Sequence, residues 1–590
     1  MRLIKNLFHQ KNSLILVVLL YILLTVVLTY PAISNFTTRI IGDGGDTWKF
    51  TWNFWWTKKA LTEFQNPYFT NYLFHPNGTS LAFDALTPLN SLISIPLQSF
   101  FNLITTYNII YFFSFIMSGL GMYLLALYLT KNKFASFIAG FMFAFSPYHI
   151  AHGLGHLNLI AIEWIPFYIL YLLKTHKEYN TKNMLLAGLF LIFTALSSWY
   201  YLLFSLMFSG LYLLYFGIKE NSFLNLLKKI APIFILTALV LSPIFITMAV
   251  DSAKYDFPIN RDPVNRDPEI YSADLLSFFI PGKLQTIGKN PFFNSITSRF
   301  NKGLLVESGN YIGFVILFLS LFSIIKLRKN RFVSFAALAG FIFFILSLGM
   351  HIHFLGKITG IPLPYSVLNE LRIFSFGGTP GRFAIMLVIS LAVLSSFALK
   401  EIFNMSSRKK RNIIMVVLCS MLFIEFLPLP IVTTSIEVPD FYKTISQDNE
   451  DYAIIDLVDL DLYSPQKLYY QTVHNKKIIG GYISRPTLNN IDFLDNTPVV
   501  TNILLNREPE EPRNVELKEY ARNILRKYNV RYIVYSKNPE STIMKTYGLN
   551  KHREDEPAYA SSIMTTYGLK KYYEDEQVEV YTPYYEERDK

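Results

Sequence analysis

The chain is organised around one short stretch that follows its first long apolar run, Ile41-Gly42-Asp43-Gly44-Gly45-Asp46-Thr47-Trp48. Two carboxylates lie three residues apart in a glycine-rich turn. The segment that begins there carries four of the six tryptophans, Trp48, Trp52, Trp55 and Trp56. Tryptophan is enriched where a membrane meets water. Because a run of bilayer length precedes the turn, we expect the two aspartates to act at the lipid–water boundary.

The composition is that of a membrane protein with a soluble part. Of 590 residues, 52% are hydrophobic and only 16% are charged, against roughly 25% charged in soluble domains. The single cysteine, Cys419, lies in an apolar run. A disulfide framework within one chain is therefore excluded.

Apolar runs long enough to cross a bilayer predict about eleven membrane spans. The first is longer than the core of a cleaved signal peptide, so we expect it to be retained. The approximate ranges are 13–30, 109–129, 134–150, 157–173, 184–198, 200–217, 230–250, 310–327, 332–350, 383–400 and 412–430.

The net charge of +11 is explained by topology rather than by nucleic-acid binding. Lysine and arginine gather before the first span and on every second connection after it, as the positive-inside rule requires. We therefore predict a multi-pass protein of the plasma membrane with a cytoplasmic N-terminus and an extracytoplasmic C-terminus. The basic connections are 131–133, 174–182, 219–229, 326–331 and 400–411.

Two domains are expected. Residues 1–430 form the membrane domain, and its large outer loops are 31–108, 251–309 and 351–382. Residues 431–590, where the apolar runs stop, form a small extracytoplasmic α/β domain. Its predicted strands and helix are Tyr452–Val458, Lys477–Ile483, Arg531–Ser536, Val578–Tyr581 and, for the helix, 515–528.

Asp43 and Asp46 are the candidate catalytic residues. Desolvation raises the pKa of a carboxylate at an apolar boundary, which brings it nearer to the working range of a general base. Two aspartates across a Gly-Gly turn could also bind a divalent cation, Mg²⁺ or Mn²⁺, through oxygen ligands. The alternative is an Asp-Gly turn that only caps the next helix.

His149, His152 and His156 follow a helical spacing of i, i+3, i+7 and so share one face of a helix. A zinc site on two of them is disfavoured, because Gly153 and Gly155 interrupt the helix and the zinc-protease motif is absent. Contacts to sugar or phosphate, or a purely structural role, remain open for these histidines.

The outer loops offer cations that could hold a phosphate. For Arg382, at a helix start near the membrane, contact with lipid headgroups is the alternative. Asp274 and Glu307 could be further carboxylates of the site or partners of the arginines. The candidate cations are Arg261, Arg266, Lys283, Arg372 and Arg382.

A long outer loop behind the first span, with an acidic residue just past that span, resembles the GT-C superfamily of membrane glycosyltransferases. The resemblance implies a polytopic helical fold, a sugar donor linked to polyprenyl phosphate, an inverting reaction, and a first-loop carboxylate as base or metal ligand. That carboxylate matches Asp43 or Asp46 of this chain.

More closely, the chain is similar to a prokaryotic group of large membrane proteins related to the YfhO-type proteins. Before the Pro-x-Arg-Phe segment, where related chains often have a bulky basic or small residue, this chain has Gly377-Gly378-Thr379. The matching stretches are Phe74-His75-Pro76-x-Gly78, Ser146-Pro147-Tyr148-His149, Gly155-His156-Leu157-Asn158, Ser272-Ala273-Asp274-Leu275-Leu276, Pro380-x-Arg382-Phe383, Tyr469-Tyr470-Gln471-Thr472-Val473-His474 and Gly480-Gly481-Tyr482.

The expected function is therefore transfer of a sugar from a polyprenyl-phosphate donor to a glycan, lipid or protein acceptor on the outer face. Two alternatives are a glycan or lipid transporter or flippase, and a membrane scaffold whose outer domain recruits partners. Working carboxylates of ion-coupled transporters tend to lie near the membrane midplane, whereas the titratable residues here lie mostly at the outer ends of spans.

Overall fold

The computed structural model describes residues 13–255, 267–300, 309–375, 377–457, 464–485, 487, 490, 493, 496–504, 515–537 and 556–584. It divides into two compact units, and each is described by itself. The first contains Met1–Phe36, Asn108–Ser242 and Asn265–Val432, and the second contains Thr37–Tyr107, Pro243–Val264 and Thr433–Lys590.

The first unit is helical. Each of the predicted apolar spans coincides with a helix or with two successive helices, and among the described residues six helical stretches are long and apolar enough to cross a membrane. The number of spans stays a prediction. The helices are α2 (Ser13–Leu28), α5 (Leu103–Thr130), α6 (Lys133–Ala144), α7 (Pro147–His152), α8 (Leu157–Ile160), α9 (Trp164–Lys177), α10 (Thr181–Ser197), α11 (Trp199–Lys219), α12 (Phe223–Lys254), α14 (Phe314–Leu327), α15 (Arg331–Ser347), α18 (Ala384–Met405) and α19 (Arg408–Phe426).

In three of the basic connections, an asparagine caps the N-terminus of the helix that follows. The side chains of Asn132, Asn180 and Asn330 each accept a hydrogen bond from a backbone N–H in the first turn of α6, α10 and α15. Such caps satisfy N–H groups that have no partner inside the helix. The polar residue that ends each connection therefore also fixes where the next helix begins.

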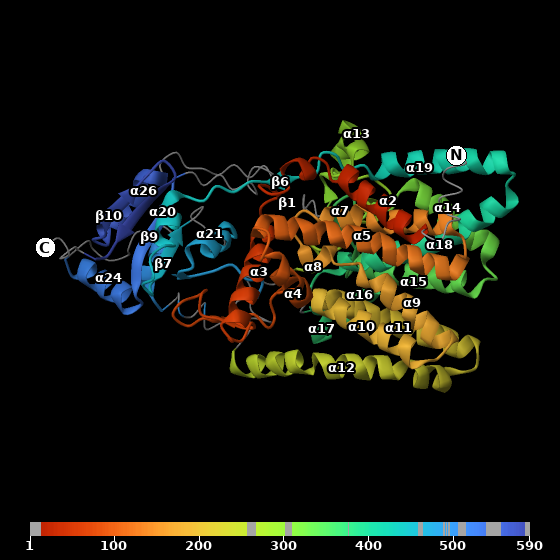
Figure 1. Cartoon of the computed structure of the whole chain (residues 1–590), viewed down its shortest axis with the longest axis horizontal. Coiled ribbons are helices and arrows are strands. Elements are labelled where there is room, and N and C mark those ends of the chain that lie inside the picture. Colours follow the sequence, from red (N-terminus) through yellow and green to blue (C-terminus); the bar gives the residue numbers. More distant parts are fainter. Residues whose placement is uncertain are drawn as a thin grey trace. The chain divides into compact units, whose positions relative to one another are not determined.

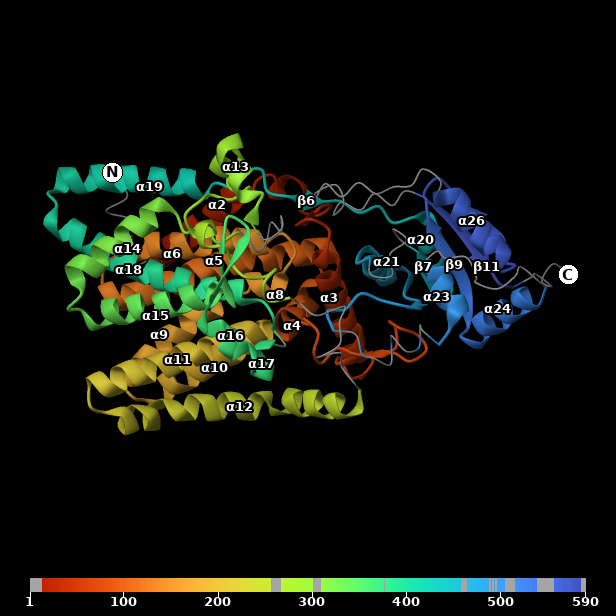
Figure 2. The ribbon, with the colours of Figure 1, turned by 180° about the vertical axis from the view of Figure 1, so that it is seen from behind.

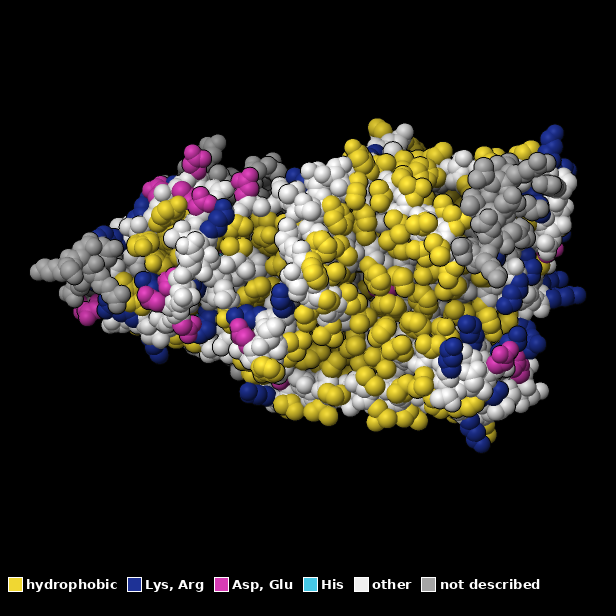
Figure 3. Space-filling model, viewed as in Figure 1, with side chains coloured by type: hydrophobic (Ala, Val, Ile, Leu, Met, Phe, Trp, Pro, Cys, Tyr) yellow, Lys and Arg dark blue, Asp and Glu magenta, His cyan; other side chains and the backbone are white. Residues whose placement is uncertain are grey.

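Helix α18 is the centre of the helical unit and packs against α6, α14 and α15 (Figure 2). Within its most apolar window 94% of the residues are buried, against 17% in α12. Figure 3 shows hydrophobic side chains spread over one face of the helical unit, with lysine and arginine gathered toward one end of it. An apolar belt bounded by a basic end is the surface expected of a membrane domain.

Shorter elements cap the helical unit. The hairpin of β4 (His351–Phe354) and β5 (Lys357–Pro362) pairs His351 with Pro362 and Phe354 with Lys357. The other elements are the 3₁₀ helices η1 (Ala32–Asn35), η2 (Leu275–Phe278), η3 (Thr286–Lys289) and η5 (Pro380–Phe383), and the α-helices α13 (Pro291–Thr297), α16 (Pro364–Asn369) and α17 (Arg372–Ser375).

The second unit contains a five-stranded mixed sheet of strand order β10-β11-β9-β7-β8 (Figure 1). Strand β7 (Ala453–Leu457) is parallel to β8 (Lys477–Ile478) and to β9 (Val530–Ser536), whereas β10 (Lys570–Glu574) and β11 (Val578–Thr582) are antiparallel. Its helices are α20 (Asp440–Ile445), α21 (Gln466–His474), α23 (Pro498–Leu504), α24 (Val515–Lys527) and α26 (Glu556–Thr566).

Residues behind the first span belong to this same unit. Helix α3 (Asp46–Thr62) packs against α4 (Pro88–Leu97) and α21. Strand β1 (Ile40–Ile41) pairs with β6 (Thr433–Thr434), and β2 (Phe69–Thr70) pairs with β3 (Thr79–Ser80). One hydrophobic core joins Trp52 and Trp56 of α3 to Ile454 of the sheet. The unit is thus assembled from segments almost 400 residues apart, such as Ile40 and Thr434.

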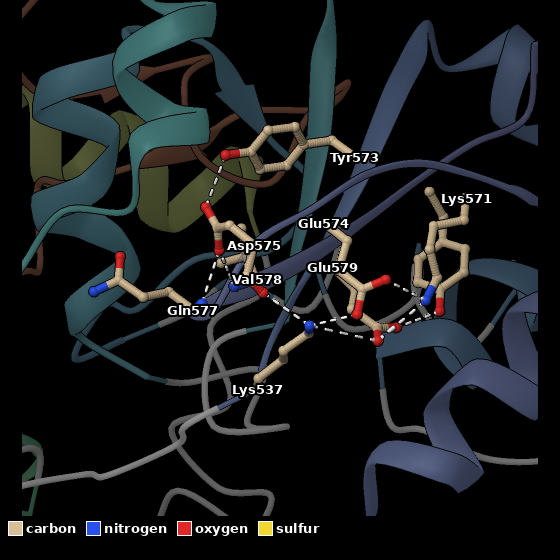
Figure 4. Close-up of polar contacts among 9 residues, drawn as sticks. Lys537, Lys571, Tyr573, Glu574, Asp575, Gln577, Val578 and Glu579 are labelled. Carbon is tan, nitrogen blue, oxygen red and sulfur yellow. Dashed lines mark hydrogen bonds and ion pairs between the residues drawn. The ribbon is translucent and has the colours of Figure 1, made fainter.

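Ion pairs between lysine side chains and Glu574 stabilise the β10–β11 hairpin (Figure 4). Lys537 Nζ lies 2.5 Å from Glu574 Oε1, and Lys571 Nζ lies 3.0 Å from Glu574 Oε2. These hydrogen bonds, that of Lys537 first, lower the pKa of Glu574 to about 2. At the turn, Asp575 Oδ1 accepts hydrogen bonds from the backbone N–H groups of Gln577 and Val578, both at 2.7 Å.

His474, at the end of α21, is completely buried, and desolvation lowers its pKa to about 3. Its Nδ1 accepts the backbone N–H of Lys476 at 3.0 Å, so Nε2 carries the proton of the neutral ring. Between pH ~6.5 and the folded pKa the unfolded chain binds a proton that the folded chain does not. Above pH ~6.5 this histidine therefore does not reduce the free energy of unfolding. Between pH ~6.5 and its folded pKa, it lowers the free energy of unfolding by ~1.4 kcal/mol for each unit that the pH decreases.

We therefore expect His474→Asn, whose side-chain oxygen can replace Nδ1 as acceptor, to remove much of this acid sensitivity. The measurement is the melting temperature of the full chain in detergent between pH 7.5 and 4.5, followed by tryptophan fluorescence. Equal pH dependence in the variant and the wild type would contradict the assignment.

Candidate functional site

The aspartate turn, residues 42–46, joins β1 to α3. Thr434 Oγ1 donates a hydrogen bond to the carbonyl oxygen of Gly42 at 2.8 Å. Gly44 has a φ of +80°, and a Cβ there would lie 2.9 Å from Thr434 Cγ2. Glycine is therefore required at this position by both conformation and space.

Both carboxylates are held within the turn. Asp43 is 7% exposed, and its Oδ1 accepts the backbone N–H of Gly45 at 2.9 Å. Asp46 is the first residue of α3 and is half-buried. A helix N-terminus stabilises negative charge. Asp43 thus makes a local turn bond to Gly45, the residue before α3, but no side-chain hydrogen bond caps the N-terminus of α3.

Asp46 has a partner from distant sequence, because the hydroxyl of Tyr482 donates a hydrogen bond to its Oδ1 at 2.5 Å. One turn further along α3, Lys49 Nζ lies 2.7 Å from Asp84 Oδ1 and donates to Ser484 Oγ at 2.5 Å. Asp84 Oδ1 also accepts the backbone N–H of Ser484 at 2.7 Å. Lys49 and Asp84 are both almost fully buried.

The tryptophans behind the turn are buried and do not lie at a lipid surface. Trp48, Trp52 and Trp56 are at most 1% exposed. The Nε1 of Trp52 donates to Gln471 Oε1 at 2.7 Å, and Trp48 packs against Tyr469 with ring centroids 5.0 Å apart. The expectation of interfacial aromatics is therefore wrong for these three, because their helix packs against α4 and α21.

The histidines divide into two kinds. The ring nitrogens of His149 lie 2.6 Å from the carbonyl oxygen of Ala144 and 2.8 Å from that of Ile160, and the ring stacks on Phe115 at 3.9 Å. Both nitrogens are thus used in joining helices. His152 is 1% exposed, and its Nδ1 has no hydrogen-bond partner within the described part of the chain.

Arg382 lies near His152. It is 3% exposed, and its guanidinium group lies 4.8 Å from the centroid of the Tyr200 ring. It interacts electrostatically with His152, whose ring is 5.9 Å from that of His156. Arg382 also stands two residues before α18, so guanidinium charge and helix dipole both favour an anion there.

Asp274 is engaged in structure. Its Oδ1 accepts the backbone N–H of Leu276 at 2.9 Å, and its Oδ2 accepts that of Gly356, in the β4–β5 turn, at 2.7 Å. Desolvation raises its pKa. Nearby, Glu269 receives His351 Nδ1 at 2.6 Å and His353 Nε2 at 2.7 Å. Asp274 thus fastens the hairpin to η2.

Lys283 is half-buried and belongs to the first unit, and the other remaining candidates have no described side chain. Arg261, Arg266 and Glu307 lie outside the described residues, and Arg372 begins α17 but its side chain is not described. Asp43 and Asp46 belong to the second unit, whereas the histidines, Arg382 and Asp274 belong to the first.

Sequence reasoning missed Lys49, Asp84, Tyr482 and Ser484. A lysine inside the aromatic run 48–56 was a detectable signal, because a buried charge needs a partner. The identity of that partner was not readable, because Asp84 and Ser484 lie 35 and 435 residues away.

A divalent cation fits the turn only in part. In the described part of the chain no three His, Cys, Asp or Glu side chains are grouped so that they could hold a metal ion. Asp84 is paired with Lys49, which leaves Asp43 and Asp46 as the carboxylates of the turn. Mg²⁺ commonly binds through one or two carboxylates and completes its shell with water and substrate phosphates.

Solved structures of membrane glycosyltransferases share this fold. The chain is similar to the archaeal oligosaccharyltransferase AglB from Archaeoglobus fulgidus, in complex with an inhibitory peptide and a dolichol-phosphate, with 13% identity, a TM-score of 0.50, and coverage of 89% of this chain and 69% of that one. It is similar to the arabinofuranosyltransferase AftD from Mycobacteria at 13% identity and a TM-score of 0.54, covering 98% of this chain and 40% of AftD. A mutant of AftD has 12% sequence identity to the chain and a TM-score of 0.56, and the match covers 98% of this chain and 42% of the mutant.

These likenesses define the class of the chain as a polytopic α-helical membrane protein with the GT-C fold. The chain spans less than half the length of AftD. A family model described as "Domain of unknown function (DUF6311)" matches residues 14–426, so the chain belongs to that family. No curated protein sequence matches it. The resemblance to the YfhO-type group stays a prediction.

The buried Lys49–Asp84 pair generates a prediction for stability. We expect Lys49→Met to destabilise the chain by ~3–5 kcal/mol, because it leaves the Asp84 charge buried without its partner. The matched control on the same helix is Lys59→Met, which breaks a more exposed pair with Glu63 and is expected to cost less than ~1 kcal/mol. Chemical unfolding in detergent, followed by tryptophan fluorescence, measures both; equal losses would contradict the prediction.

Proposed function

We propose that the chain is an integral membrane glycosyltransferase that transfers a sugar from a polyprenyl-phosphate donor to a glycan, lipid or protein acceptor on the outer face of the plasma membrane. The observation that carries the proposal is the buried Asp43–Asp46 turn at the start of α3, directly behind the first apolar helix, in a chain of GT-C fold. The bound dolichol-phosphate and peptide of AglB support a lipid-linked donor.

In the proposed reaction one of the two aspartates acts as general base. It takes the proton of the acceptor hydroxyl, whose oxygen forms a bond to the anomeric carbon from the face opposite the phosphate. The bond from that carbon to the phosphate oxygen breaks, and polyprenyl phosphate leaves with the electron pair. Attack from the opposite face inverts the anomeric configuration.

Asp43 and Asp46 would also hold a divalent metal, Mg²⁺ or Mn²⁺. When bound, the metal would supply positive charge for the leaving phosphate. The chain's own contribution is to keep two carboxylates three residues apart on a turn that Gly44 and Thr434 fix.

Arg382 would bind the donor phosphate. Its guanidinium group is buried, lies against Tyr200 and precedes the N-terminus of α18. A planar guanidinium suits phosphate recognition better than an ammonium group does. Of the histidines, His152 interacts electrostatically with this cation and its ring is 5.9 Å from that of His156, whereas His149 is occupied by backbone carbonyl groups.

We expect purified protein in lipid to transfer labelled sugar from at least one member of a panel of polyprenyl-phosphate donors, and Asp46→Asn or Asp43→Asn to reduce transfer by about 100-fold or more, because a neutral amide cannot take the proton. EDTA would abolish transfer if a metal is required. The matched control is Asp440→Asn, an exposed aspartate at the first position of α20, which should retain full activity.

Transfer that persists with both aspartates replaced would overturn the proposal for the turn. Movement of the intact lipid-linked sugar across vesicles without transfer would favour the flippase alternative. A phenotype that depends on residues 431–590 but not on the aspartates would favour the scaffold.

The phosphate assignment predicts a separate effect. Arg382→Gln should lower kcat/KM for the donor by about 100-fold, the typical loss when one donor to a developing anion is removed. Arg382→Lys should recover part of it, because the charge remains. Arg331→Gln, which breaks an exposed pair with Glu220, is the control. Unchanged donor kinetics in Arg382→Gln would refute a phosphate role.

A further inference from the structure

The segment 480–485 lies against the aspartate turn within the second unit. Through it, Tyr482 reaches Asp46 with the hydrogen bond of 2.5 Å. The two residues are 436 positions apart, and both are half-buried. A phenol that donates to a carboxylate limits the rotation of that carboxylate, and such charge-assisted bonds are stronger than neutral ones.

The first end of this segment is fixed by residues of the first outer loop. The backbone N–H of Phe74 donates to the carbonyl oxygen of Gly480 at 2.8 Å, and that of Ile478 donates to the carbonyl oxygen of Tyr72 at 2.9 Å. A Cβ on Gly481 would lie 3.0 Å from Phe74 Cε2. The backbone just before Tyr482 therefore packs closely on residues 72–74.

The other end is fixed by the buried ion pair. Ser484 donates its backbone N–H to Asp84 and receives Lys49 Nζ on its hydroxyl oxygen. Lys49 lies on α3, three residues after Asp46. Because one helix carries both Asp46 and the lysine that anchors Ser484, the position of Tyr482 relative to Asp46 is determined from both sides.

We propose that Tyr482 is a positioning residue for Asp46: its hydroxyl orients the carboxylate for proton transfer, and the Lys49–Asp84 pair holds Ser484 so that this contact is kept. The consequence for catalysis rests on the proposed glycosyltransferase function, whereas the contact itself does not. The residues from the C-terminal segment thereby become part of the site formed by the first outer loop.

The contact is tested first without any activity measurement. Carboxyl groups of the full chain in detergent are labelled with a water-soluble carbodiimide and an amine, and the labelling of each aspartate is quantified by mass spectrometry. Tyr482→Phe should increase the labelling rate of Asp46 by roughly 10-fold, since a hydrogen bond to a charged group gives protection of that order. Asp43 in the same turn is the internal reference and should not change.

The matched control is Tyr469→Phe. Tyr469 also lies near the turn and packs on Trp48, and its substitution removes only a hydroxyl. It should leave the labelling of Asp46 unchanged. Equal increases in Tyr482→Phe and Tyr469→Phe would indicate general loosening of the unit and would overturn the proposal.

Kinetics then test the role of the contact. Tyr482→Phe should lower kcat by about 100-fold, as misplacement of a reacting group does, with little change in KM. In an Asp46→Asn background, Tyr482→Phe should cost nothing further.

The outcomes separate the two proposals. Wild-type protein that transfers no sugar, together with increased Asp46 labelling in Tyr482→Phe, would reject the enzyme function and keep the contact. Active wild type with an unchanged kcat in Tyr482→Phe, or losses that multiply in the double variant, would reject the positioning role and keep the enzyme function.

Discussion

One buried ion pair connects the three segments that form the site of the second unit. Lys49 and Asp84 come from the helix and the loop that follow the first span, and each is nearly inaccessible to water. Burial of two charges is unfavourable unless both are paired and further hydrogen bonds satisfy them. Ser484 supplies a hydrogen bond to Lys49 Nζ and one to Asp84 Oδ1, whereas Asp84 Oδ2 has no hydrogen-bond partner among the described residues. The buried pair is therefore stabilised only in a fold that brings Ser484 into contact with Lys49.

The charged residues proposed for the reaction are of opposite sign in the two units, and each unit stabilises its charges in a different way. In the second unit, a glycine turn and a helix N-terminus hold two carboxylates, and a phenol orients one of them. In the first unit, a buried guanidinium is stacked on an aromatic ring just before a long helix. The second unit thus offers oxygen anions and the first a cation, and the proposed glycosyl transfer would use both kinds of charge.

Much of the helical architecture was readable from local patterns. The apolar run 109–129 lies within α5, and the run 383–400 lies in α18 except for its first residue, which ends η5; a helix is the structure that satisfies its backbone inside an apolar environment. The predicted strands 531–536 and 578–581 lie within β9 and β11, but β10 was missed, since its residues, Lys570 to Glu574, are largely exposed and charged. The helix predicted over 515–528 corresponds to α24.

The sequence by itself determined the class of the protein, the order of its helices and the aspartate turn, because apolar periodicity, charge placement and glycine conformation act over a few residues. Only the tertiary structure decided that Trp48 and Trp52 are core residues, that His149 is occupied by carbonyl groups, and that Tyr482 reaches Asp46. Those outcomes depend on pairing between residues up to 436 positions apart. No local pattern encodes such a pairing, because the contact stabilises the chain only after the long loop between the two residues has closed.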